Sequence, residues 1–128
     1  MSERAIQNSI RNDLAGRCHA FRANVGKAWT GSAFIRQPNG DLLIKDPRPF
    51  DTGLPTGFSD LFGIKQTLIT EEMVGQHVGQ FFALEIKDVK GRMSPAQEKF
   101  LAAVERANGV AGVARSVDDA RRVLGLKS

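Results

Sequence analysis

The segment Phe81–Lys87 constrains the fold of this chain most strongly, because its residues alternate with the two-residue period of a β-strand. A capping serine and a first-turn proline in Ser94-Pro-Ala-Gln-Glu then predict a helix that runs to Asn108-Gly109. The apolar run Val110–Ala114 predicts a second, buried strand. A strand, a helix and a strand in this order predict a right-handed crossover between parallel strands.

The two ends of the chain predict further helices and a short strand. Apolar residues spaced three and four apart predict an amphipathic helix from Ser2 to about Gly16. We expect a short strand over His19–Val25 and a final helix that Ser116 caps and that runs through Leu124. Together with the crossover, these elements predict an α/β domain.

The middle of the chain predicts a β-hairpin followed by a loop. The apolar runs Ala33–Arg36 and Leu42–Lys45 flank Asn39-Gly40, a pair typical of two-residue hairpin turns. Prolines and glycines among polar residues predict a surface loop over Asp46–Gly57. With 128 residues and 41% hydrophobic content, the chain fits a single domain over residues 1–128, because two domains would each be too small to bury a useful core.

The charge balance favours a polyanionic partner, because Lys and Arg outnumber Asp and Glu by 18 to 14 and give a formal net charge of +4. Cys18 is the single cysteine, which excludes an intrachain disulfide and a cysteine-rich zinc cluster and predicts a reduced setting. The polar N-terminal segment lacks the apolar core of a signal peptide, and no stretch approaches the roughly 20 apolar residues of a membrane span. We therefore expect a cytoplasmic protein with no membrane partner. No motif for a nucleotide cofactor occurs.

Two carboxylates within apolar runs are the candidates for chemistry, Asp60 and Glu85. A buried carboxylate is costly unless it is paired, protonated, exposed at an edge or bound to a cation. Lys87 projects from the same strand face as Glu85, because side chains alternate along a strand. Two carboxylates beside an ammonium suit phosphodiester hydrolysis with a hard divalent ion such as Mg²⁺. The lysine can orient or deprotonate the attacking water, or stabilise the phosphate in the transition state.

An ordinary structural role is the alternative for the same residues. Glu85 and Lys87 would then form a same-face ion pair on a half-exposed strand, and Asp60 would cap a turn. A lone Glu-x-Lys tripeptide favours this alternative, because so short a motif occurs by chance in many proteins. The motifs around it favour the chemical role.

Four motifs follow one another along the chain: Gly57-Phe-Ser-Asp60, Ala83-Leu-Glu85-Ile-Lys87, Gly91-Arg-Met-Ser94-Pro-Ala-Gln97 and Gly112-Val-Ala-Arg-Ser116. With the N-terminal Glu3-Arg-Ala-Ile-Gln7, they resemble the stand-alone phage and bacterial type of the VRR-NUC family, a branch of the PD-(D/E)XK nuclease superfamily. The resemblance implies a restriction-endonuclease-like core, in which helices flank a central mixed β-sheet and a β-hairpin is inserted. It also implies a Mg²⁺- or Mn²⁺-dependent endonuclease that cuts branched DNA, such as a Holliday junction, as a homodimer.

The resemblance assigns roles residue by residue. Asp60 and Glu85 would bind the metal together with the main-chain carbonyl of Ile86. Lys87 would be the catalytic lysine, and Gln97 would support the site.

The first helix and the basic residues complete the candidate site. The family uses an acidic residue on the first helix, for which Glu3 is the candidate and Gln7, four residues away on the same helix face, is the rival. A solvated acid in the first helical turn is the alternative role of Glu3. The candidates for binding DNA phosphates are Lys90, Arg92, Arg22 and Arg115.

Two features depart from the family pattern. Ser59 stands before Asp60 where the family usually has proline, and Lys65–Gln80 makes the interval to Glu85 long, so this segment must fold out as an excursion. Two other functions stay open: a DNA-binding module that kept the fold and lost catalysis, and a nuclease for ordinary duplex or single-stranded DNA. The first of these would be expected to have lost some of the candidate catalytic side chains, all of which are present.

Overall fold

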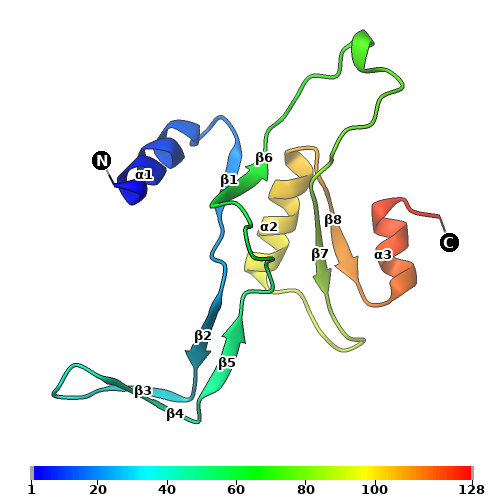
Figure 1. Cartoon of the computed structure of the whole chain (residues 1–128). Helices are drawn as coiled ribbons and strands as arrows, with labels where there is room; N and C mark the ends of the chain where they lie inside the picture. The colour runs from blue at the N-terminus through cyan, green and yellow to red at the C-terminus, as the bar shows by residue number, and fades with distance from the viewer. Residues whose placement is uncertain (1, 128) are drawn as a thin grey trace. The chain divides into compact units, whose positions relative to one another are not determined.

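The computed structural model of the protein describes residues 2–127 and is mixed α/β (Figure 1). Three α-helices and four two-stranded sheets lie within these residues. The chain divides into two compact units. The first takes in the residues up to Ala20 and from Gly63 onward, and the second is Phe21–Phe62. The predicted α/β class is confirmed.

The predicted crossover lies in the first unit. β7 (Phe82–Ile86) and β8 (Val110–Ala114) pair in parallel along their whole length. α2 (Pro95–Arg106) connects them and begins at the predicted serine cap. Gly109 makes the tight return from the helix to β8 possible, because a Cβ there would lie 2.8 Å from Cγ1 of Val104.

A small apolar core joins α2 to the strands. Val104 is 1% exposed and forms a buried cluster with Ile64, and Ala83 of β7 packs against that cluster. Ala83 therefore belongs to the face of β7 that meets α2. Since side chains alternate along a strand, Glu85 and Lys87 lie on this same face. The pairing of strand and helix thus directs both candidate residues toward α2.

Both terminal helices form where the sequence predicts them. In α1 (Glu3–Leu14), Ser2 Oγ accepts a hydrogen bond from the N–H of Ala5 at 3.1 Å. α3 (Val117–Leu124) begins at Ser116, which accepts from the N–H of the third helical residue, and it packs against β8. No helix within residues 2–127 is long and apolar enough to cross a bilayer.

β1 (His19–Arg22) pairs with β6 (Leu61–Ile64), and the chain passes from one unit to the other within both strands. The strand predicted over His19–Val25 ends earlier than expected. Gly26, four residues beyond the end of β1, has φ of 132°, a conformation that glycine adopts far more readily than other residues.

The second unit contains two antiparallel strand pairs. β2 (Lys27–Thr30) pairs with β5 (Arg48–Asp51), and β3 (Ala33–Arg36) pairs with β4 (Leu42–Lys45). The pair of β3 and β4 is the predicted hairpin.

The turn of this hairpin differs from the predicted two-residue type. Gly40 is left-handed, with φ of 93°, and its N–H donates to the carbonyl of Gln37 at 3.0 Å, whereas Asn39 is not left-handed. Pro38 holds φ near the value that suits the first central residue of a type I turn. The proline therefore selects a longer turn than the Asn-Gly pair alone predicts.

The prediction of a loop over Asp46–Gly57 is wrong in part, because β5 lies within this segment. Pro49 of β5 stands opposite Trp29 of β2, a segment in which we predicted no strand. Proline is tolerated on such edge strands, since a two-stranded sheet leaves one side of each strand outside the ladder. Pairing with a distant segment, rather than local propensity, makes this stretch a strand.

Lys65–Gln80 forms the excursion that the sequence requires between β6 and β7 (Figure 1). Its regular part is η1 (Glu71–Met73), a single turn of 3-10 helix. Side-chain amides near its two ends donate to the main chain at the end of α2 and just beyond it: Gln66 to the carbonyl of Arg106 at 3.4 Å, and Gln80 to that of Asn108 at 3.0 Å. Both ends of the excursion are therefore tied to the crossover.

Replacing Val104 by Ala should lower the free energy of unfolding by about 2 kcal/mol, because two buried methyl groups are lost and a cavity is left. Urea unfolding followed by circular dichroism measures the change. The matched control is Val74→Ala, which removes the same groups from a side chain that is 76% exposed and should change stability by less than about 0.5 kcal/mol. Equal losses in the two variants would contradict the assigned core.

Candidate active site

Glu85 and Lys87 meet at the end of β7. The Nζ atom of Lys87 lies 3.4 Å from Oε1 of Glu85, and their side chains are 20% and 29% exposed, respectively. The N–H of Lys87 donates to the carbonyl of Ala114 at 3.2 Å, which continues the parallel pairing beyond β7. The strand therefore fixes the main chain on which both charged groups stand.

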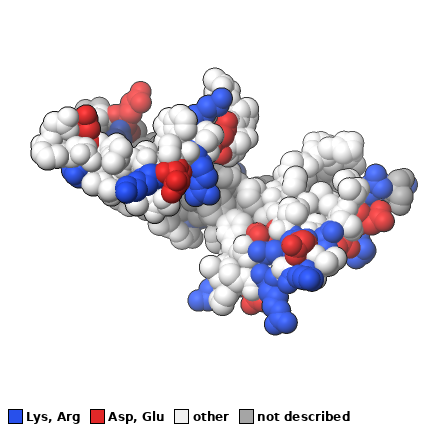
Figure 2. All heavy atoms as spheres, turned by 90° about the horizontal axis from the view of Figure 1, so that it is seen from below, with Lys and Arg blue, Asp and Glu red and all other residues white. Residues whose placement is uncertain are grey.

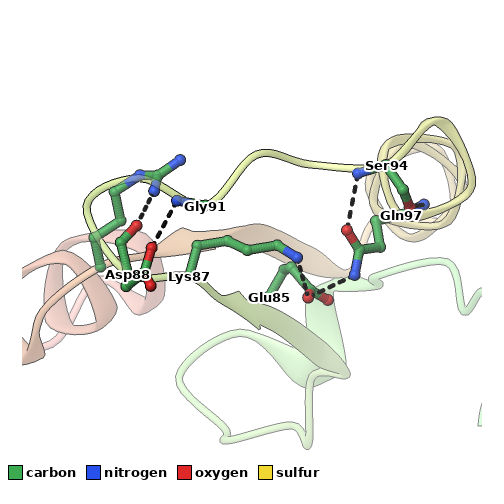
Figure 3. Close-up of polar contacts among 7 residues, drawn as sticks. Glu85, Lys87, Asp88, Gly91, Ser94 and Gln97 are labelled. Carbon is green, nitrogen blue, oxygen red and sulfur yellow. Dashed lines mark hydrogen bonds and ion pairs between the residues drawn. The ribbon is translucent and has the colours of Figure 1, made fainter.

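Gln97 joins this ion pair from the first turn of α2 (Figure 3). Its Oε1 accepts from the N–H of Ser94 at 2.9 Å, and Ser94 Oγ accepts from the N–H of Gln97 at 3.1 Å, so the two residues form a reciprocal cap. Because the amide oxygen is used in the cap, the NH₂ group is left to donate to Glu85. It does so at 2.8 Å, to the same Oε1 that Lys87 contacts.

The loop after β7 is held by Asp88. Its Oδ1 accepts from the N–H of Lys90 at 2.9 Å and from the N–H of Gly91 at 2.6 Å. The guanidinium of Arg115, just after β8, donates to the main-chain carbonyl of Asp88. Arg115 thus anchors the loop, a contact that its predicted role toward DNA did not include, while Lys90 and Arg92 are exposed on or beside the loop.

The start of α3 fixes Arg115 in turn. The N–H of Arg115 donates to Oδ2 of Asp119 at 2.9 Å, and Arg122 forms an ion pair with Oδ1 of Asp119 at 2.9 Å. The hydrogen bond from Arg115 is the larger cause, and the bond to Arg122 the next, of the lowered pKa of the Asp119 carboxyl. Asp119 therefore stays ionised and keeps the main chain of Arg115 in place.

The other predicted site residues belong to segments of the sequence distant from Glu85, Lys87 and Gln97. Asp60 belongs to the second unit, is exposed, directly precedes β6 and accepts from the N–H of Ala23 through its main-chain carbonyl at 3.0 Å. Glu3 is an exposed acid in the first turn of α1, and Gln7 lies one turn later and is half-buried. Arg22 is exposed at the end of β1.

The structure therefore brings together Glu85, Lys87 and Gln97. In the part of the chain that the structure describes, no group of three or more His, Cys, Asp or Glu residues is placed to hold a metal ion. Asp88 is the residue of the site that the sequence reasoning missed. An aspartate followed three residues later by glycine, directly after a strand, is the local signal that could have found it.

Comparisons of the chain with protein-family models, with curated proteins and with solved structures found no match. The site comprises one carboxylate held through a single oxygen by an amide and an ammonium, at the junction of a strand and a helix N-terminus.

Replacing Gln97 by Glu should lower the free energy of unfolding by about 1 kcal/mol in metal-free buffer, because a donor to Glu85 becomes a second carboxylate. The helix cap should survive, since glutamate also accepts from the N–H of residue 94. The double variant Gln97→Glu with Glu85→Gln exchanges the two groups and should recover part of the loss. Urea unfolding in EDTA tests this, and an additive loss in the double variant would show that the two side chains do not interact.

Proposed function

We propose that the protein is a metal-dependent endonuclease that hydrolyses phosphodiester bonds in DNA. The observation that supports this most directly is the convergence of Lys87 and Gln97 on one oxygen of Glu85. A carboxylate that only balanced a lysine would not need an amide donor from the start of another element. The proposal also includes a restriction-endonuclease-like core, of which the parallel pair of β7 and β8 with α2 would be the central part.

Mg²⁺ or Mn²⁺ is the cofactor that fits this chemistry. Glu85 offers a hard oxygen donor in a partly exposed position, and both Lys87 and Gln97 contact its Oε1 rather than its Oε2. By the family resemblance, the carboxylate of Asp60 and the main-chain carbonyl of Ile86 would complete the donor set, with Glu3 or Gln7 in support. When bound, the ion supplies positive charge that stabilises the phosphate in the transition state.

The residues of the cluster have separate tasks in this proposal. The ammonium of Lys87 orients or deprotonates the attacking water and stabilises the negative charge that develops on the phosphate. Gln97 fixes the rotamer of Glu85, because its own amide orientation is set by the cap at Ser94. Side chains that are already held in the reactive geometry need little reorganisation during the reaction, and this preorganisation raises the rate.

Basic side chains are available to hold the DNA backbone. Figure 2 shows lysine and arginine side chains at the surface, interspersed with acidic and uncharged ones. Lys90 and Arg92 are exposed on or beside the loop that follows the catalytic strand, and Arg22 is exposed at the end of β1. In this proposal they contact phosphates, which favours affinity rather than sequence preference.

Branched DNA is the proposed substrate, and a homodimer is the proposed active form. A four-way junction has near two-fold symmetry, so two symmetric active sites could cut two of its strands. Both faces of the β3–β4 hairpin carry exposed apolar side chains, Phe34 and Leu42 on one and Ile35 and Leu43 on the other, and these support association with a second copy.

A cleavage assay on junction, flap, nicked, duplex and single-stranded DNA should show metal-dependent cutting that is greatest on branched substrates. Lys87→Ala should lower kcat by at least about 100-fold, because a group acting in the transition state is removed. Lys65→Ala is the matched control, since it removes the same side chain from an exposed position outside the cluster and should keep full activity.

Each outcome of this assay separates the candidate functions. Cutting in EDTA, or full activity of Lys87→Ala, would contradict the mechanism. Binding of DNA without cutting under any metal would instead favour a DNA-binding module. Equal rates of cutting on ordinary duplex and on junction DNA would favour a nuclease that acts on ordinary duplex or single-stranded DNA.

Light scattering should give a particle of twice the chain mass of 14.0 kDa. Leu43→Asp should shift the measured mass toward that of the monomer, because a charge on the hairpin face would have to be buried at the dimer interface. Leu68→Asp is the control, since Leu68 is 84% exposed on the excursion and away from the hairpin in sequence. A wild-type monomer that still cuts junctions on two strands would contradict the dimer.

A further inference from the structure

Gly91 lies against the alkyl chain of Lys87. A Cβ at position 91 would lie 3.3 Å from both Cβ and Cδ of Lys87 and 3.2 Å from Oδ1 of Asp88. The φ of Gly91 is not in the positive region that favours glycine, so its backbone conformation suits other residues equally well. The presence of glycine at position 91 is therefore explained by the lack of space beside Lys87, and not by a backbone conformation that only glycine favours.

The loop that carries Gly91 is fixed from two directions. From within the loop, Asp88 Oδ1 accepts from the N–H of Gly91 (Figure 3). The same oxygen accepts from the N–H of Lys90. From the neighbouring strand, the guanidinium of Arg115 donates to the carbonyl of Asp88. The loop therefore cannot easily move away from the lysine beneath it.

We infer that Asp88 and Gly91 are positioning residues, which hold the Lys87 side chain so that its ammonium stays beside Glu85. A lysine has four rotatable side-chain bonds, and an exposed one samples many rotamers. Here the loop packs along the Cβ-to-Cδ part of the chain, and the ammonium meets Oε1 of Glu85 at 3.4 Å. A methyl group at position 91 would push against the flexible alkyl chain, which yields more easily than the tethered loop.

The catalytic consequence rests on the proposed nuclease function, whereas the ordering of the lysine does not. Gly91→Ala should lower the ¹³C-relaxation order parameter at Cε of Lys87 in the full-length protein, with the overall fold kept. In the cleavage assay it should lower kcat by about 3- to 10-fold, because contacts of 3.3 Å require the lysine chain to shift by a few tenths of an ångström, and small displacements of a catalytic group slow the reaction. KM should stay within about twofold, since phosphate contacts are unchanged.

Gly79→Ala is the matched control, because a Cβ at Gly79 meets nothing within 4 Å and its φ is also not positive. It should leave both measurements unchanged. Asp88→Ala should reproduce the effects of Gly91→Ala, whereas Asp88→Asn keeps an acceptor at Oδ1 and should restore most of the order and rate.

The two readouts separate failure of this inference from failure of the proposed function. An unchanged Lys87 order parameter in both Gly91→Ala and Asp88→Ala would overturn the positioning role, even if the wild-type protein cuts DNA. A lowered order parameter in a protein that cuts no DNA would support the positioning role and contradict the nuclease. A loss of rate that Asp88→Asn shares fully with Asp88→Ala would also overturn the role of the acceptor.

Discussion

The parallel pairing of β7 with β8 is the constraint on which the rest of the first unit depends. Parallel neighbours cannot be joined by a short turn, so the chain must cross over one face of the pair, and α2 does so. The crossing buries Val104 almost completely and fixes which face of β7 meets the helix. Glu85 and Lys87 lie on that face at the end where the helix begins, so the position of the site follows from the pairing.

Gln97 links the stability of a helix to the geometry of a carboxylate. An amide has one acceptor and one donor group, and the cap at Ser94 takes the acceptor. The donor that remains is directed to Glu85. A residue that would serve only to start a helix thereby gains a second task, and the half-buried side chain of Glu85 gains a hydrogen bond.

The loop after β7 shows how surface charges can serve structure and function together. Arg115 is basic and exposed, which predicts a contact with phosphate, yet its guanidinium holds the main chain of Asp88. Asp88 in turn closes the loop through two N–H groups, which leaves Lys90 and Arg92 at its surface. Whether a basic side chain anchors the main chain or stays at the surface depends on which partners lie within reach, and formal charge carries no information on this.

The sequence by itself determined the elements whose signals are local. Serine caps and apolar periodicity located the three helices, and the alternation over Phe81–Lys87 put Glu85 and Lys87 on one face, because these patterns depend on residues a few positions apart. Tertiary structure alone decided the strand containing Pro49, which needs a partner about twenty residues away along the chain. It also decided which face of β7 meets α2, since both faces of that strand carry apolar residues, and it revealed that Gly91 lies against Lys87. Contacts of this kind depend on how elements pack in space, and spacing along the chain does not encode them.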